Sequence, residues 1–173
     1  PPDRKALEAL KEFRSGYHPH ENGEMYFRTP TSLADEYKVE GVDLQTFEIL
    51  ANEDYAKDKN NVYFYGRKLE GADSESFTII NFKLYFVDLK AYVEAMDSPY
   101  SKDKNNVYYK GNNVKEADTK SFTVIDFNFS KDKNNIYSYD KKILEIKPEM
   151  LKNDGRIKFT YDGQNYDLKY NNK

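Results

Sequence analysis

The 173-residue chain contains no cysteine and no tryptophan, and it has only 8 glycines and 6 prolines. The absence of cysteine excludes a disulfide framework, a thiol nucleophile and cysteine-ligated zinc sites. No apolar run approaches the roughly 18 residues of a transmembrane helix, so we predict no membrane span. The net charge of -3 is too small to favour disorder by self-repulsion. The sequence therefore predicts one folded domain of ordinary size.

Aromatic residues are abundant, with 16 Tyr and 11 Phe, and we expect their rings to supplement a thin aliphatic core. The charge is uneven, at -6 over residues 1–56 and +3 over residues 129–173. Such a gradient can steer a charged partner, but it is not the dense basic stripe that nucleic acid requires. The first residue is Pro1 and not Met, so we expect any targeting signal to have preceded it.

The main organising feature is an internal repeat. The pentapeptide Lys-Asp-Lys-Asn-Asn occurs three times, at residues 57–61, 102–106 and 131–135. An aromatic and a small residue precede each copy, and a β-branched residue and a tyrosine follow it. The period between the last two copies is 29 residues and that between the first two is 45, so the second repeat carries an insertion of 16.

A second motif, Asp-x-x-Ser/Thr-Phe, occurs in residues 41–50, 71–80 and 116–125. It reads as a capped single helical turn that directs its phenylalanine into the interior. These phenylalanines are Phe47, Phe77 and Phe122. The first copy lacks an upstream pentapeptide, so we predict a degenerate first repeat that starts near Met25.

The stretch Lys-Asp-Lys-Asn-Asn-Val-Tyr-Tyr at 102–109, followed by Ala-Asp-x-x-Ser-Phe at 117–122, resembles the DKNYY family of bacterial repeat proteins. The resemblance covers about residues 25–154. It implies a tandem array in an exported or envelope-associated protein, and it implies no particular biochemical activity. The second tyrosine of the motif is Phe64 in one copy and Ser138 in another, which argues against a ligand that needs both tyrosines in every repeat.

Each repeat is predicted to form a β-hairpin, because aromatic and β-branched residues flank the turn-forming Asp-Lys-Asn-Asn segment. We expect the Asp to act as an Asx-type acceptor and one Asn to take positive φ. Strand alternation then separates a β-branched face, the predicted core, from a tyrosine face. The β-branched residues are Val62, Val107 and Ile136, and the tyrosines are Tyr63, Tyr108 and Tyr137.

The predicted fold class is mainly β, an antiparallel hairpin-repeat meander or short solenoid with an N-terminal capping helix and one inserted helix. The capping helix is predicted over residues 3–15, which have apolar residues along one side and end before Gly16. The inserted helix is predicted over residues 88–96, where Leu89, Tyr92, Val93 and Met96 fall at i, i+3, i+4 and i+7. Because a 29-residue unit is shorter than a propeller blade of about 40–45 residues, the sequence favours the meander or solenoid over a closed propeller.

These elements predict one cooperative unit with a helix-and-loop cap over residues 1–24 and a repeat domain over 25–173. Within the repeat domain, the predicted segments are 25–54 for the degenerate repeat, 55–99 for the repeat with the inserted helix, 100–128 and 129–154 for two further repeats, and 155–173 for a terminal hairpin.

No residue set in the sequence predicts a metal, a cofactor or a catalytic centre. His18 and His20, with Glu21 and Glu24 nearby, offer two imidazoles, but no third ligand stands at a suitable spacing, which favours an exposed loop. The pentapeptide aspartates, Asp58, Asp103 and Asp132, are each flanked by lysines, which favours a turn over a calcium loop. No phosphate loop or serine elbow is present, so we predict no enzymatic activity.

The function predicted from the sequence is a non-catalytic bacterial binding module, exported or envelope-associated, with a protein or glycan partner. The alternatives are an immunity or inhibitor protein that neutralises a toxin, cytoplasmic if it is an immunity protein, and, less favoured, a carboxylate-based hydrolase. We expect the partner to contact the insertion and the tyrosine face. The predicted binding residues are Tyr63, Tyr108, Lys90 and Glu94.

Overall fold

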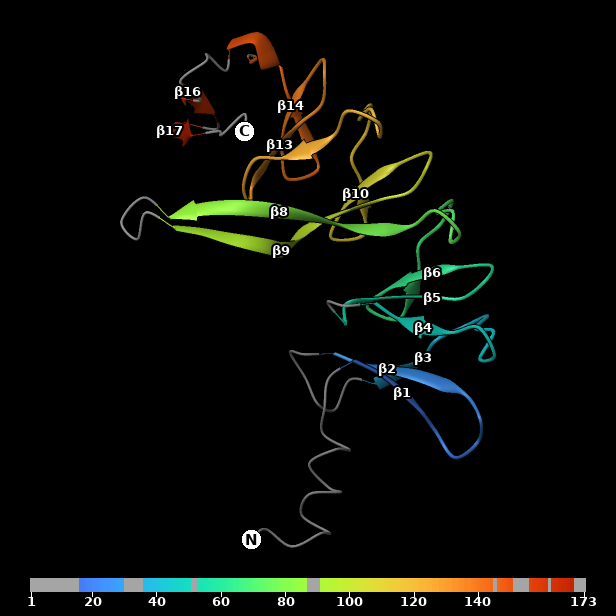
Figure 1. Ribbon diagram of the computed structural model, residues 1–173. Coiled ribbons are helices and arrows are strands. Elements are labelled where there is room, and N and C mark those ends of the chain that lie inside the picture. The colour runs from blue at the N-terminus through green and yellow to red at the C-terminus, as the bar shows by residue number, and fades with distance from the viewer. Residues whose placement is uncertain are drawn as a thin grey trace, which may run out of the picture. The chain divides into compact units, whose positions relative to one another are not determined.

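The computed structural model describes residues 16–29, 36–50, 53–86, 91–144, 146–150, 156–161 and 163–169, with backbone alone at 83–86, 91–96, 156–159, 161 and 166–169. Its contacts divide the chain into two compact units, Pro1–Glu75 and Ser76–Lys173. Apart from one short 3-10 helix, the regular elements of these residues are all β-strands (Figure 1). No helix in this part of the chain is long and apolar enough to cross a membrane.

The strands of the first unit are β1 (Gly16–Pro19), β2 (Met25–Arg28), β3 (Glu36–Lys38), β4 (Glu48–Ile49), β5 (Tyr55–Lys57), β6 (Val62–Phe64) and β7 (Arg67–Lys68). The elements of the second unit are β8 (Thr78–Phe86), β9 (Ala91–Lys102), β10 (Val107–Tyr109), β11 (Asn112–Asn113), β12 (Thr123–Val124), β13 (Phe129–Lys131), β14 (Ile136–Ser138), β15 (Lys141–Ile143), the 3-10 helix η1 (Pro148–Met150), β16 (Arg156–Tyr161) and β17 (Gln164–Lys169).

The described strands form antiparallel sheets in which neighbours in sequence pair in space. β1, β2 and β3 form the N-terminal sheet. Three four-stranded meanders follow, here called the first (β4–β7), second (β8–β11) and third (β12–β15) repeat sheets, and β16 pairs with β17. The first strand of each repeat sheet follows the Asp-x-x-Ser/Thr-Phe motif and pairs with the strand before the next pentapeptide. Each structural repeat therefore straddles a boundary predicted from the sequence.

The pentapeptide forms the predicted four-residue turn, which Lys57 and Val62 close as a strand pair in the first repeat sheet. The Asp58 Oδ1 atom accepts the backbone N–H groups of Asn60 and Asn61, both at 2.7 Å. The other two copies repeat this Asx geometry at the same distances. The Asx-type acceptor predicted from the sequence is thus confirmed.

The prediction of positive φ in the pentapeptide is wrong, because none of its asparagines has positive φ. In the turn that follows each hairpin, left-handed φ values occur at Tyr65, Lys110 and Tyr139, at 47°, 45° and 55°. A two-residue connection between twisted strands requires this conformation, whereas the Asp side chain closes the longer turn without it.

The second carboxylate oxygen of each pentapeptide Asp accepts the hydroxyl of the tyrosine five residues later. These O···O distances are 2.9 Å for Asp58 and Tyr63, 3.0 Å for Asp103 and Tyr108, and 2.7 Å for Asp132 and Tyr137. We call this arrangement, with the two backbone N–H groups, the Asp–Tyr clasp. All six side chains are buried. Burial and the neighbouring carboxylate raise the pKa of Tyr137, so its hydroxyl keeps its proton and donates.

The Asp-x-x-Ser/Thr-Phe motif is tied to the pentapeptide that follows it. In the third repeat sheet the backbone N–H of Asp118 donates to Asp132 Oδ2 at 2.9 Å, and Lys133 N–H donates to Ser121 Oγ at 3.1 Å. The Lys133 ammonium also lies 3.0 Å from the Asp118 carboxylate. Asp43, Thr46, Asp58 and Lys59 make the same contacts in the first repeat sheet. The two motifs therefore recur together because they form one hydrogen-bonded unit.

Both faces of the central repeat strands are buried, which corrects the prediction of one core face. Val62, Tyr63, Ile136 and Tyr137 are all 0% exposed. Tyr63 packs in a cluster with Phe27 of the N-terminal sheet, and Tyr137 packs with Val107 of the second repeat sheet. Within each unit, the tyrosine face of one sheet thus covers the sheet before it.

The predicted fold class is wrong in its helices, since the described residues contain no α-helix. Residues 91–96 of the predicted inserted helix belong to β9, which pairs with β8 from Thr78↔Lys102 to Phe86↔Ala91. These residues form a strand because the insertion prolongs two strands that are already paired by hydrogen bonds, whereas an isolated nine-residue helix is marginally stable in water. The predicted capping helix over residues 3–15 lies outside the described residues.

The stability of the chain is expected to fall as the pH drops below about 4. Hydrogen bonds from Ser121 and the ion pair with Lys133 lower the pKa of Asp118 to about 2. Burial raises the pKa of Asp132, but hydrogen bonds from three backbone N–H groups and Tyr137 outweigh it, so this pKa also lies below its usual value.

Because both pKa values are lower in the folded state, the stabilisation is complete near neutral pH and is lost as the pH falls toward the folded values. Urea unfolding at a series of pH values between about 6 and 2 would measure it. A free energy of unfolding that stays constant down to pH 2 would contradict the expectation.

Candidate functional site

Two of the four binding residues predicted from the sequence, Tyr63 and Tyr108, are buried. Tyr63 is 0% and Tyr108 1% exposed, and each donates its hydroxyl to an Asp–Tyr clasp, so a partner has no access to these rings. Glu94 lies on β9, where the structure describes backbone alone. Lys90 lies outside the described residues.

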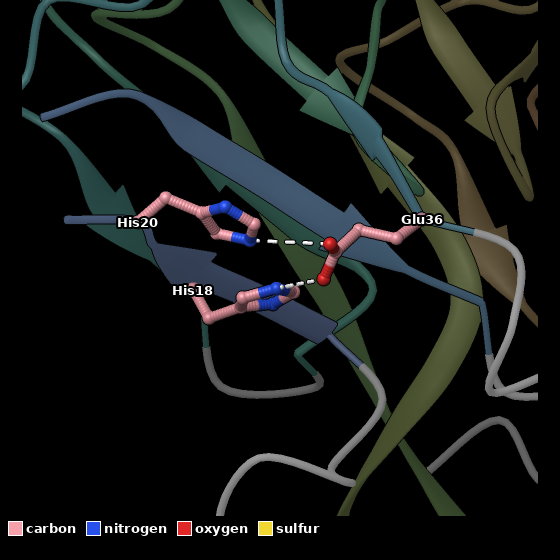
Figure 2. A group of neighbouring side chains, drawn as sticks. All are labelled: His18, His20 and Glu36. Atoms are coloured by element: carbon pink, nitrogen blue, oxygen red, sulfur yellow. Dashed lines mark hydrogen bonds and ion pairs between the residues drawn. The ribbon is translucent and has the colours of Figure 1, made fainter. Parts of the chain in front are cut away.

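A cluster of ionisable side chains lies instead on the N-terminal sheet. It consists of His18 on β1, His20 just after β1, and Glu36 on β3, with one potential ligand atom of each within 4.8 Å of those of the others. Figure 2 shows both imidazole rings directed at the Glu36 carboxylate. His18 Nε2 contacts Glu36 Oε1, and His20 Nε2 lies 3.1 Å from Glu36 Oε2. We call these three residues the His–Glu cluster.

Strand alternation explains why the cluster forms. Tyr17, Phe27 and Tyr37 are paired in one row across the sheet and belong to the buried core or pack against it. The neighbouring rows therefore project to the opposite face. The row on one side contains the pair of Arg28 and Glu36, and the row on the other side contains the pair of His18 and Tyr26. The interpretation that residues two apart face the same way is confirmed for His18 and His20.

Contacts around the cluster fix the orientation of both imidazoles. His18 Nδ1 lies 3.1 Å from the carbonyl oxygen of Gly16, which can only accept, so Nδ1 carries the proton and donates. The His20 ring stacks on Tyr26, with 3.9 Å between ring centroids and 19° between the planes. Both Nε2 atoms are thereby held toward the carboxylate.

The electrostatics of the cluster centre on Glu36, whose side chain is 23% exposed. Burial raises the pKa of Glu36, but hydrogen bonds from His18, His20 and Arg28 outweigh it and hold the pKa below its usual value. Arg28 Nη2 donates to Glu36 Oε1 at 2.8 Å. Glu36 is therefore an ionised carboxylate near neutral pH.

A shallow pocket of about 640 Å³ opens over the cluster. Its lining residues are His18, Pro19, His20, Glu21, Asn22, Arg28 and Glu36. Two imidazole nitrogens and one carboxylate oxygen that converge on a pocket can bind a metal ion, or an imidazolium can pair with the carboxylate.

Glu36 is the residue of the cluster that could not be identified from the sequence. Glu21 and Glu24 stand close to the histidines in sequence, but neither belongs to the cluster. Glu36 is 16 residues beyond His20, and only the pairing of β2 with β3 brings it alongside. Strand alternation could have identified Glu36 only if the register were known, because the pairing of Glu36 with Arg28 sets the face of the sheet on which Glu36 lies.

Comparison with known proteins matches the chain to one family model. No curated protein and no solved structure matched the chain. The DKNYY family model matches residues 2–94 and 100–172, which together include almost the whole chain. The matched residues contain the pentapeptides, their clasps and the His–Glu cluster. The chain therefore belongs to the DKNYY family.

Proposed function

We propose that the chain is a non-catalytic protein-binding module, exported or associated with the bacterial envelope, in which the repeats serve as the scaffold. The observation that carries this proposal is the inward direction of the repeated motif. Each pentapeptide Asp is at most 3% exposed and its acceptor atoms are used by the chain's own donors. A surface for a partner then lies in the parts that the repeats do not share.

The largest unshared part is the ribbon that the insertion forms. We define the ribbon as Asn81–Phe86 of β8 and Ala91–Asp97 of β9, which pair only with each other among the described strands. β10 pairs with β9 only from Tyr100 to Lys102, so Figure 1 shows β8 and β9 extending beyond their sheet as a long hairpin.

The ribbon supports binding by strand addition. The outer edges of its two strands have no described strand as a neighbour, and such edges present rows of backbone donors and acceptors. An extended peptide segment of a partner protein can extend the ladder there, with main-chain hydrogen bonds giving affinity. The immunity and hydrolase alternatives remain predictions of the sequence, and no observation favours them here.

Site-specific photocrosslinking in the producing cells would test the proposal. A photoreactive residue replaces Asp97, which is exposed on the ribbon, and the matched control replaces Lys120, which is exposed in a repeat turn. We expect one discrete protein adduct from position 97 in the envelope or secreted fraction and none from position 120. No adduct from position 97, or the same adducts from both positions, would contradict the proposal.

A further inference from the structure

We propose that His18, His20 and Glu36 bind one divalent transition-metal ion, for which Zn²⁺ is the best match. This site is separate from the ribbon, and the inference goes beyond the binding function proposed above. Its ligands would be the Nε2 atoms of the two histidines and one carboxylate oxygen of Glu36.

The distances suit an ion of this size. Ligand atoms at about 2.1 Å from a tetrahedral ion lie about 3.4 Å from each other. The three ligand atoms of the His–Glu cluster already lie within 4.8 Å of one another, and His20 Nε2 is 3.1 Å from Glu36 Oε2. Side-chain rotations alone can close the remaining gap, with β1, β2 and β3 kept in register.

A second contact orients the His18 ring for metal binding. Because Nδ1 donates to the Gly16 carbonyl, the ring nitrogen directed at Glu36 Oε1 is Nε2, the atom through which this histidine would coordinate an ion. A backbone carbonyl that holds Nδ1–H is also the usual outer contact of a metal-bound histidine.

Arg28 shapes the site without occupying it. Its Nη2 atom donates a hydrogen bond to Glu36 Oε1. The other carboxylate oxygen, Oε2, which contacts His20, is then available to the ion. A hydrogen bond of this kind orients a ligating carboxylate. The guanidinium charge also repels a cation, so we expect binding in the micromolar range, weaker than a closed structural zinc site.

The ligand set selects the kind of ion. Two imidazoles and one carboxylate suit Zn²⁺ and other late first-row ions, whereas Ca²⁺ and Mg²⁺ prefer oxygen ligands alone. Three protein ligands leave at least one position, which faces the pocket lined by Pro19, Glu21 and Asn22. Water or a donor group of another molecule would complete the coordination there.

Titration calorimetry with ZnCl₂ on the tag-free, chelator-treated full chain would test the site. We expect saturable binding of one ion per chain. Glu36→Gln and His18→Gln should each weaken the affinity at least ten-fold, because each removes one of three ligands. Glu24→Gln is the matched control: Glu24 lies just before β2 and pairs with Lys38 at 2.5 Å, but it is outside the cluster and its loss should leave the affinity unchanged.

The absorption of cobalt(II) gives a second measurement that needs no variant. A cobalt ion bound by this ligand set gains visible d–d bands, and these should disappear when Zn²⁺ displaces it. Absence of saturable Zn²⁺ binding, or affinities of both ligand variants equal to that of the unmodified chain, would overturn the proposal. If a ligand variant does not fold, cobalt bands that Zn²⁺ removes support the site, and their absence overturns it.

Discussion

Replacing Asp132 by Ala is expected to lower the free energy of unfolding by about 3–5 kcal/mol. The carboxylate is 2% exposed and accepts the backbone N–H groups of Asp118, Asn134 and Asn135. Without it, these donors lose their acceptor, and an unsatisfied donor away from water, such as that of the buried Asn135, costs about 1–3 kcal/mol. Tyr137 retains the Glu116 carbonyl as an acceptor for its hydroxyl, so the loss falls mainly on the backbone donors.

Urea unfolding of Asp132→Ala would measure the loss, with Asp97→Ala as the matched control on an exposed strand position. The control should change the free energy of unfolding by no more than about 0.5 kcal/mol. Asp132→Asn keeps one carbonyl oxygen for two N–H groups, so its loss should lie between the two. Equal effects of Asp132→Ala and Asp97→Ala would show that the Asp–Tyr clasp does not stabilise the fold.

Replacing Gly66 by Ala is expected to cost about 2–4 kcal/mol, from a steric clash added to backbone strain. Gly66 has a φ of +71°, and its N–H donates to the Tyr17 hydroxyl at 3.0 Å. An added Cβ would stand 2.4 Å from Phe27 Cβ, a backbone-anchored atom that cannot rotate away. The turn between β6 and β7 would therefore have to separate from the N-terminal sheet.

Gly71→Ala isolates the contribution of the backbone. Gly71 has a nearly equal φ of +75°, but a Cβ there meets no heavy atom within 4 Å. Its substitution should cost only the left-handed strain of about 1 kcal/mol. Thermal unfolding of the two variants would compare them, and equal melting temperatures would refute the clash.

The hairpins could be predicted from the sequence because their determinants are local. The Asp that opens each turn lies two and three residues from the N–H groups it accepts, so a single segment specifies the geometry. The burial of Tyr63 and Tyr108 could not be predicted the same way. A strand read alone has one core face and one free face, and only the stacking of sheets covers both.

The inserted segment shows a limit of periodicity. Leu89, Tyr92, Val93 and Met96 match a helical stripe, but β8 supplies a partner strand, and pairing with it overrides the local pattern. The His–Glu cluster shows a second limit. Glu36 is one of 30 acidic residues, and nothing near it in sequence marks it as a neighbour of His18 and His20. Its position follows from strand register, which a single sequence leaves open.

The tie between each Asp-x-x-Ser/Thr-Phe turn and the following pentapeptide sets the unit by which such an array can be excised or extended. In the third repeat sheet that unit runs from Glu116 to Ile143, and it contains both the turn and the clasp that the turn completes. A peptide cut at the pentapeptide period, over residues 100–128, would hold a turn without its acceptor Asp132. Extension by whole units instead adds one complete sheet at each step, and the tyrosine face of the added sheet can pack on the sheet before it, as Tyr137 does.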